Sequence, residues 1–123
     1  MKKRQIYILA AILLPLALIY YYFFYLHSAV RLTELAVAAN DPAICHEANE
    51  AEFMSGASRE DCYYQVASVH NNITACNYSV SSKDLCFETV AAGLKDETVC
   101  DKIGSDSDQS RRNECKKSVR DMK

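Results

Sequence analysis

The first part of the chain is almost entirely apolar, whereas the rest alternates polar and apolar positions at helical spacing. No Asp, Glu, Lys or Arg lies between Arg4 and Arg31, and the apolar run over 6–26 has 21 residues. An α-helix needs roughly 20 residues to cross the hydrocarbon core of a bilayer. The pattern therefore predicts a transmembrane helix over 6–26.

Two other interpretations of this run are weaker. A cleavable signal peptide has an apolar region of about 7–15 residues and a cleavage site between small residues. This run is longer, and the bulky His27 precedes the small residues Ser28 and Ala29. A buried core helix would need apolar surroundings, which the rest of the chain does not supply. An uncleaved signal anchor is the preferred interpretation.

Charges and aromatic residues around the run predict its orientation. The basic residues at 2–4 directly precede it, and basic residues beside a span stay in the cytoplasm. The aromatic cluster at 20–25 is typical of a membrane–water interface. We therefore expect a cytoplasmic tail over 1–5, a single pass through the plasma membrane, and an extracellular or periplasmic remainder.

A second helical segment follows the apolar run. Residues 31–40 read RLTELAVAAN, and Ala, Leu and Glu favour helix. We expect the membrane helix to continue to about Ala39, with His27 at the membrane surface. A helical stalk over 27–40 would hold the remaining chain roughly 15–20 Å above the bilayer, at about 1.5 Å per residue.

Beyond residue 40, polar helix-capping residues mark six helix starts. In DPAICHEANE, Asp41 precedes Pro42, and proline suits the first helical position. The other predicted caps are Ser58, Asn72, Ser81 or Ser82, Asp96 and Ser110, with Asp108 as an alternative to the last. Short and long helices alternate and pair over about 41–71, 72–95 and 96–123. The chain is therefore predicted to be all-α, with a domain of three helical hairpins over 41–123.

The three long helices share an internal repeat. Their sequences are REDCYYQVASV, KDLCFETVAAG and RNECKKSVRDM, and in each a valine follows the cysteine by four residues. Val69 and Met122 extend two of these stripes at the seventh position, where helical side chains share a face. In the third repeat Lys116 replaces the aromatic residue, as expected for a terminal repeat with a polar outer face.

All six cysteines lie beyond the apolar run, which indicates three disulfides in an oxidising compartment. Only 13 of the 83 residues over 41–123 are Ile, Leu, Val or Phe, too few for a large core. Each bridge could add on the order of 3 kcal/mol to the free energy of unfolding. Pairing across a 13-residue helix would exceed the roughly 7 Å between bridged Cα atoms. The predicted pairs are Cys45–Cys62, Cys76–Cys86 and Cys100–Cys115.

The repeat D-x-x-x-C, followed by [RK]-x-x-C-[YF]-x-x-V-A, resembles small secreted or membrane-anchored cysteine-repeat proteins of archaea and bacteria. The matching stretches are DPAIC with REDCYYQVA, NITAC with KDLCFETVA, and DETVC with RNECKKSVR. The third unit departs from the pattern at Lys116 and Arg120. The resemblance implies stacked helical hairpins and export, and it implies no particular activity.

Motifs of common catalytic and metal sites are missing. There is no Cys-x-x-Cys for redox or zinc chemistry, and Cys45 and His46 are adjacent instead of spaced. The acidic loop around Asp106 lacks EF-hand spacing, and three glycines form no phosphate-binding loop. The histidines at 27, 46 and 70 are scattered. We therefore expect no enzyme activity, no cofactor and no small-molecule substrate.

Charge separates the final helix from the preceding segments. Residues 41–123 contain ten basic and fifteen acidic residues, a balance that disfavours nucleic-acid binding. The last helix is locally basic and has two interpretations: it neutralises the acidic repeats, or it binds an anionic partner or lipid headgroup. The candidate contacts are Arg111, Arg112, Lys116, Lys117 and Arg120.

Asn72 and Asn77 begin N-glycosylation sequons, although Asn72 is also a predicted helix cap. The preferred function is a membrane-anchored, non-enzymatic module that binds or scaffolds proteins, because stacked hairpins present extended surfaces. The alternative is an accessory subunit of a larger membrane complex. Aromatic residues are the candidate partner contacts, although some must form the core: Tyr63, Tyr64, Tyr78 and Phe87.

Overall fold

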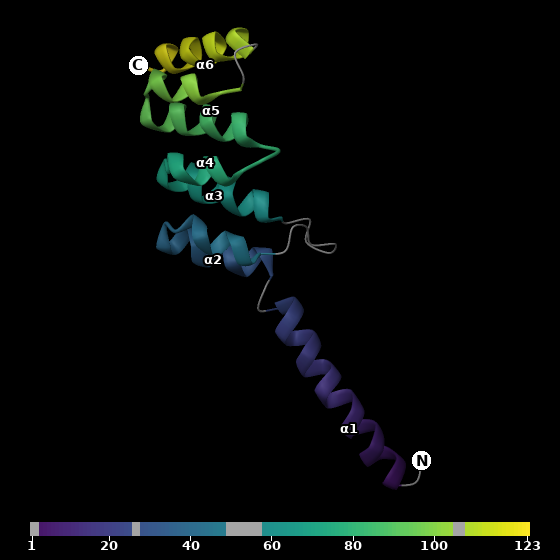
Figure 1. The fold of residues 1–123 in the computed structure, drawn as a ribbon. Helices are drawn as coiled ribbons and strands as arrows, with labels where there is room; N and C mark the ends of the chain where they lie inside the picture. Colours follow the sequence, from purple (N-terminus) through teal and green to yellow (C-terminus); the bar gives the residue numbers. More distant parts are fainter. Residues whose placement is uncertain (1–2, 26–27, 49–57, 105–107) are drawn as a thin grey trace.

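A computed structural model describes residues 3–25, 28–48, 58–104 and 108–123, and shows one projecting helix followed by a stack of helices (Figure 1). Over these ranges the chain is helical without a β-strand, which confirms the all-α prediction. In chain order the elements are α1 (Lys3–Tyr20), the π-helix η1 (Tyr21–Tyr25), α2 (Ala29–Ala39), the 3₁₀ helix η2 (Pro42–Glu47), α3 (Arg59–His70), α4 (Ile73–Tyr78), α5 (Lys83–Leu94), the 3₁₀ helix η3 (Glu97–Lys102) and α6 (Gln109–Asp121).

The projecting helix is the apolar one. Gln5–Phe24 has a mean hydropathy of 2.1, and none of it is buried against the rest of the protein. Its length and composition are sufficient to cross a membrane, and a signal sequence at an N-terminus has the same properties. The predicted apolar helix is therefore present, and its orientation follows only from the flanking charges.

The prediction of a free helical stalk over 27–40 is wrong, because α2 packs against other helices. Ser28 has non-helical backbone angles (φ −56°, ψ 128°), so α2 begins afresh after it. α2 contacts α3 and η2, and its inner side chains Ala29, Leu32 and Ala36 are at most 6% exposed. Burial of these side chains favours packing over a free stalk, so α2 is the first layer of the stack. His27 lies outside the described residues.

The long helices α2, α3, α5 and α6 follow one another along the stack, and the short helices η2, α4 and η3 lie between them in sequence (Figure 1). The helices α2, α3 and α5 each pass to the next short helix through the same two-residue joint. The first residue of each joint has a left-handed backbone conformation, with φ of 51° at Asn40, 53° at Asn71 and 54° at Lys95. Asn tolerates this conformation better than most residues.

Hydrogen bonds close each joint in the same way. In each joint, the backbone N–H of the second residue donates a hydrogen bond of 3.0 Å to the carbonyl of a buried alanine five positions earlier. These bonds run from Asp41 to Ala36, from Asn72 to Ala67 and from Asp96 to Ala91. The second residue's side chain then caps the short helix, as predicted for Asp41, Asn72 and Asp96. The motif ends one helix and starts the next without a loop.

Each long helix buries a narrow stripe. In α3 and α5 the stripe comprises the cysteine and the residues one, four and five positions later, all at most 2% exposed. Val69 is 57% exposed and Met122 47% exposed, so the predicted extension of the stripes is wrong. Val69 lies about 90° around the helix from the centre of its stripe, at about 100° per residue. α6 starts after Asp108, the alternative start, and buries Cys115 and Val119.

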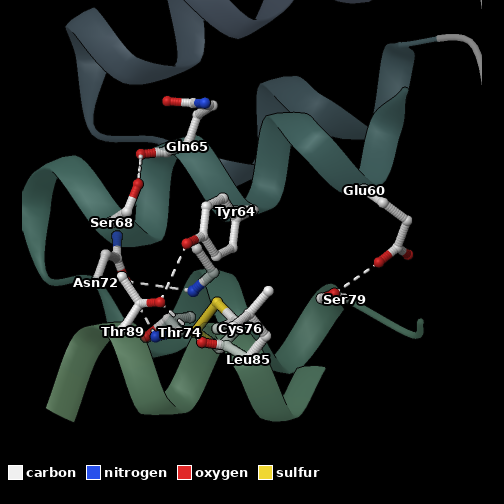
Figure 2. Close-up of a disulfide and its surroundings, with 12 residues drawn as sticks. Glu60, Tyr64, Gln65, Ser68, Asn72, Thr74, Cys76, Ser79, Leu85 and Thr89 are labelled. Carbon is white, nitrogen blue, oxygen red and sulfur yellow. Dashed lines mark hydrogen bonds between the residues drawn. A yellow bond between two sulfur atoms is a disulfide. The ribbon is translucent and has the colours of Figure 1, made fainter. Parts of the chain in front are cut away.

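The structure contains the three predicted disulfides, Cys45–Cys62, Cys76–Cys86 and Cys100–Cys115. Their Cα atoms lie 5.5–5.9 Å apart. Each bridge joins a short helix to the long helix that follows, as Figure 2 shows for Cys76 between α4 and α5. Tight joints and disulfides therefore alternate along the chain, and together they connect all the layers.

The second joint also packs against the following layer. A Cβ atom added at Gly93 would lie 1.9 Å from Oδ1 of Asn71 and 2.9 Å from its Cγ. The close approach of α5 to this joint therefore requires glycine at position 93.

We predict that Gly93→Ala lowers the free energy of unfolding by about 1–2 kcal/mol, because overpacking outweighs the gain in helix propensity. In an Asn71→Gly background the overlap is gone, and the same substitution should stabilise the protein by up to about 1 kcal/mol. Denaturant unfolding of the four chains measures both effects. Equal effects in the two backgrounds would show that the contact between Gly93 and Asn71 is unimportant.

Access to solvent predicts the order in which the disulfides are reduced. Cys115 is 7% exposed and lines a cavity of about 650 Å³ between α5 and α6, whereas the other five cysteines are fully buried. Thiol–disulfide exchange needs access to a sulfur atom. Brief native reduction and alkylation, followed by mass spectrometry, should label Cys100 and Cys115 first. Earlier labelling of Cys76 and Cys86 would contradict this order.

Candidate functional site

Three aromatic rings meet where η2, α3 and α4 come together. The His46 ring centroid lies 5.6 Å from that of Tyr63 and 4.9 Å from that of Tyr78, and both pairs meet edge to face. Tyr63 and Tyr78 are stacked at 5.7 Å. We call these three residues the ring cluster. It joins the first two disulfide-linked layers, because His46 follows Cys45 on η2, and Tyr78 lies at the end of α4.

Tyr63 supports the cluster from inside. Its side chain is 2% exposed, and its hydroxyl lies 2.5 Å from Nδ1 of His46. Burial raises the pKa of the Tyr63 phenol above its ordinary value; Arg59 opposes this rise, and Glu60 and Tyr78 add to it. The phenol therefore stays protonated, and its hydrogen bond with Nδ1 fixes the orientation of the exposed imidazole. Tyr78 is 44% exposed and forms the accessible face of the cluster.

The ring cluster borders an open pocket of about 420 Å³, which is also lined by Arg59, Glu60 and Val80. Arg59 Nε donates to the carbonyl of Ala48 at 3.0 Å, and this bond holds the arginine side chain at the N-terminal end of α3. Val80 is 85% exposed, although it is apolar. The pocket therefore combines tyrosine and arginine with an exposed aliphatic side chain.

Glu60 fixes the segment that carries Val80. Its carboxylate accepts from Ser79 Oγ at 2.6 Å (Figure 2). It also accepts from the Val80 backbone N–H at 3.0 Å. Burial by itself would raise the pKa of Glu60. Hydrogen bonds from Ser79 and from the backbone at 80–82 together lower the pKa by more, so it lies below its ordinary value of 4.5. Glu60 is therefore ionised near neutral pH, and its oxygen atoms are occupied within the protein.

An equivalent contact recurs one layer on. Asp84, two residues before Cys86, accepts from the backbone N–H of Gly104 at 3.0 Å. Glu60 is likewise two residues before Cys62, and Val80 and Gly104 each follow a short-helix cysteine by four residues. The contact therefore belongs to the repeat. The first turns of α3 and α5 each hold the next short-to-long connection, a role that sequence reasoning missed.

The polar groups of the pocket are engaged within the protein. Glu60 is saturated by hydrogen bonds, and the Tyr63 hydroxyl is buried against His46. Among the residues that the structure describes, no group of three or more His, Cys, Asp or Glu side chains is placed to hold a metal ion. The exposed surface of the pocket is formed by the His46 and Tyr78 rings and the Val80 side chain.

The predicted basic contacts of α6 face acidic side chains of the preceding layer. Arg111 pairs with Glu88 at 2.7 Å and Asp84 at 3.3 Å, and Lys116 pairs with Asp101 at 2.6 Å. Hydrogen bonding and the charge of Glu88 raise the pKa of Arg111. Arg120 pairs with Glu97 at 3.8 Å, Arg112 is half-buried, and Lys117 is exposed. This geometry supports neutralisation of the acidic repeats, and anion binding stays a prediction.

The remaining predicted sites differ in access. Asn72 uses Oδ1 to cap α4 and donates through Nδ2 to Asn40 Oδ1 at 2.9 Å, so a glycan on Nδ2 would leave this nitrogen a single N–H beside Asn40. Asn77 is exposed on α4. Tyr64 is half-buried, and its hydroxyl lies 3.1 Å from the Thr89 hydroxyl (Figure 2). Tyr63 and Phe87 are core residues, so only Tyr78 among the four candidate aromatics is broadly accessible.

The histidine and charged residues of the pocket were not predicted as a site. Their signals were weak: His46 follows a cysteine directly, and Arg59 and Glu60 read as residues of a first helical turn.

Comparison with models of protein families, with curated protein sequences and with solved structures gives no match to this chain.

We predict that Glu60→Gln lowers the free energy of unfolding by about 1–2 kcal/mol at neutral pH, because bonds to a charged acceptor are weakened. The folded-state pKa of Glu60 is depressed, so its stabilisation is present above pH 4.5 and is lost as the pH falls through that pKa. The difference between wild type and variant should shrink in acid. Exposed Glu47→Gln is the control; a difference for Glu60→Gln that is independent of pH would disprove the assignment.

Proposed function

We propose that this protein is a single-pass, membrane-anchored module that binds another protein outside the cytoplasm through the pocket beside the ring cluster. The N-terminal helix fits a membrane anchor, and the basic residues before it favour a cytoplasmic N-terminus. Disulfides in the stack agree with an oxidising compartment outside the cytoplasm. The resemblance to cysteine-repeat proteins agrees with the same location.

The observation that carries the binding proposal is the fixed exposure of Val80 beside Tyr78. Glu60 holds the Val80 backbone, and the buried Tyr63 holds His46, so the pocket is pre-organised. Pre-organised side chains lose little conformational entropy when a partner binds. Tyrosine and arginine supply much of the energy of protein interfaces, and both line this pocket. A non-enzymatic binding role follows from these features.

An accessory subunit of a membrane complex is the second candidate. The observation that favours it is that Gln5–Phe24, with Pro15 in its middle, presents all of its side chains away from the rest of the protein. In mild detergent, a stoichiometric partner that stays bound when Tyr78 is changed to alanine would favour this candidate over binding through the pocket.

We predict that photo-crosslinking from the pocket captures a protein partner in native membranes. With Val80→benzoylphenylalanine a discrete adduct should form, and Tyr78→Ala should reduce its yield about tenfold, as for removal of a hot-spot tyrosine. Lys117→benzoylphenylalanine, on the exposed side of α6, is the matched control. Identical adducts from both positions, or no adduct from position 80, would contradict binding at this pocket.

A further inference from the structure

A tyrosine ring fills part of the interface between the layers α3 and α5. Tyr64 lies two residues after Cys62 on α3, is half-buried, and packs against the hydrophobic core. Its hydroxyl lies 3.1 Å from the hydroxyl of Thr89, which lies three residues after Cys86 on α5 (Figure 2). The Tyr64 ring therefore bridges two successive long helices.

The next interface, between α5 and α6, has no such ring. Counted from the cysteines, Glu88 is the equivalent of Tyr64, and Ser118 is the equivalent of Thr89. Glu88 pairs with Arg111 at 2.7 Å. Glu88 and Ser118 both line the cavity of about 650 Å³ between these two helices. The repeat therefore leaves an open space at the position where the preceding interface holds a phenol ring.

The cavity can hold a ring and bond its hydroxyl. Ala92 and the buried Val119 give it apolar walls. The Ser118 hydroxyl has no partner among the residues that the structure describes, so it is available to a ligand as Thr89 is to Tyr64. The volume of the cavity lies within the range of about 300–1,000 Å³ that is typical of small-molecule sites.

The charge of the cavity favours a cationic ligand. Three carboxylates line it, from Glu88, Asp108 and Glu114, but only one cation, Arg111. Arg111 is already engaged by Glu88 at 2.7 Å. The Glu114 carboxylate is exposed and has no partner within the described part of the chain. A surplus of negative charge in a concave site attracts cations and repels anions.

We propose that the cavity between α5 and α6 binds a small aromatic amine that carries a phenol hydroxyl. The ring takes the place that Tyr64 has in the preceding interface, its hydroxyl bonds to Ser118, and its ammonium group pairs with Glu114. Positions 114 and 118 are four residues apart on α6, which places their Cβ atoms about 6 Å apart on one face. One small ligand can therefore contact both side chains.

A tyrosine side chain of a partner protein is the competing occupant. It would supply the same ring and hydroxyl, but its backbone brings neutral amide groups where the cavity presents the unpaired Glu114 carboxylate. A charge-assisted hydrogen bond is roughly twice as strong as a neutral one. The small amine is therefore the favoured occupant. This site shares no lining residue with the pocket beside the ring cluster, so the two are tested separately.

Three probes separate these possibilities by calorimetric titration of the full-length chain in detergent micelles, with protein-free micelles as the blank. Tyramine carries the ring, the hydroxyl and the ammonium group. Phenethylamine lacks the hydroxyl and should bind about five- to tenfold more weakly, as expected for one lost hydrogen bond. N-acetyltyrosinamide lacks the cation and should bind at least about tenfold more weakly than tyramine.

Substitutions locate the binding in the cavity. Glu88→Tyr restores the ring of the preceding interface and should abolish tyramine binding, whereas Glu88→Gln leaves the space open and should retain it. Ser118→Ala should remove the preference for tyramine over phenethylamine. Glu114→Gln should weaken tyramine binding about tenfold. Asp121→Asn, an exposed acidic position of α6 outside the cavity, is the matched control and should change nothing. Intact disulfides are verified for each variant.

Several outcomes would overturn the proposal. One is the absence of tyramine binding at a ligand concentration of about 1 mM. Another is equal affinity for tyramine and phenethylamine, or tyramine binding that Glu88→Tyr and Glu114→Gln leave unchanged. N-acetyltyrosinamide that binds as tightly as tyramine would also overturn it, and would assign the cavity to a tyrosine of a partner protein.

Discussion

The disulfide between each short helix and the long helix that follows is the constraint on which the stack depends. Beyond residue 40 the chain has few large aliphatic residues, and the side chains that it buries are mainly cysteine, alanine and valine. Such small side chains remove little apolar area from water, at roughly 25 cal/mol per Å². The covalent bridges restrict the unfolded chain and also fill the core, because five of the six cysteines are fully buried.

The tight joints are the second half of this arrangement. Each uses one left-handed residue and one capping residue, so a long helix is followed at once by a short helix of fixed direction. Variation in chain length is confined to the connections from short to long helices. These connections carry Val80 and the hydrogen bonds to Glu60, so the rigid part of the repeat positions the variable part. This division between scaffold and exposed connection is usual for binding surfaces.

Helix capping and cysteine spacing predicted the hairpins and the three disulfides, because both depend on residues close in sequence. The packing of α2 was not predicted, since helix propensity at 31–40 specifies a helix without specifying its neighbours. One signal was present: Ala36 precedes Asn40 and Asp41 at the spacing that separates Ala67 from Asn71 and Asn72. The repeat defined by the cysteines does not include this segment, because α2 contains no cysteine.

The ring cluster could not be predicted from spacing, because His46, Tyr63 and Tyr78 come from three helices and meet only after the layers stack. Sequence also could not separate exposed from buried aromatics. Tyr63 and Phe87 directly follow cysteines on long helices and turn inward, whereas Tyr78 ends a short helix and stays accessible. The sequence shows that basic residues gather on α6, but their acidic partners on α5 and η3 emerge only from tertiary structure.

Peptide mapping of the unreduced protein tests the central claim most directly, because the bridges connect the layers. The account predicts Cys45 linked to Cys62, Cys76 to Cys86 and Cys100 to Cys115, with no free thiol. Recovery of free thiols, or of a bridge between Cys62 and Cys76 on neighbouring hairpins, would contradict it.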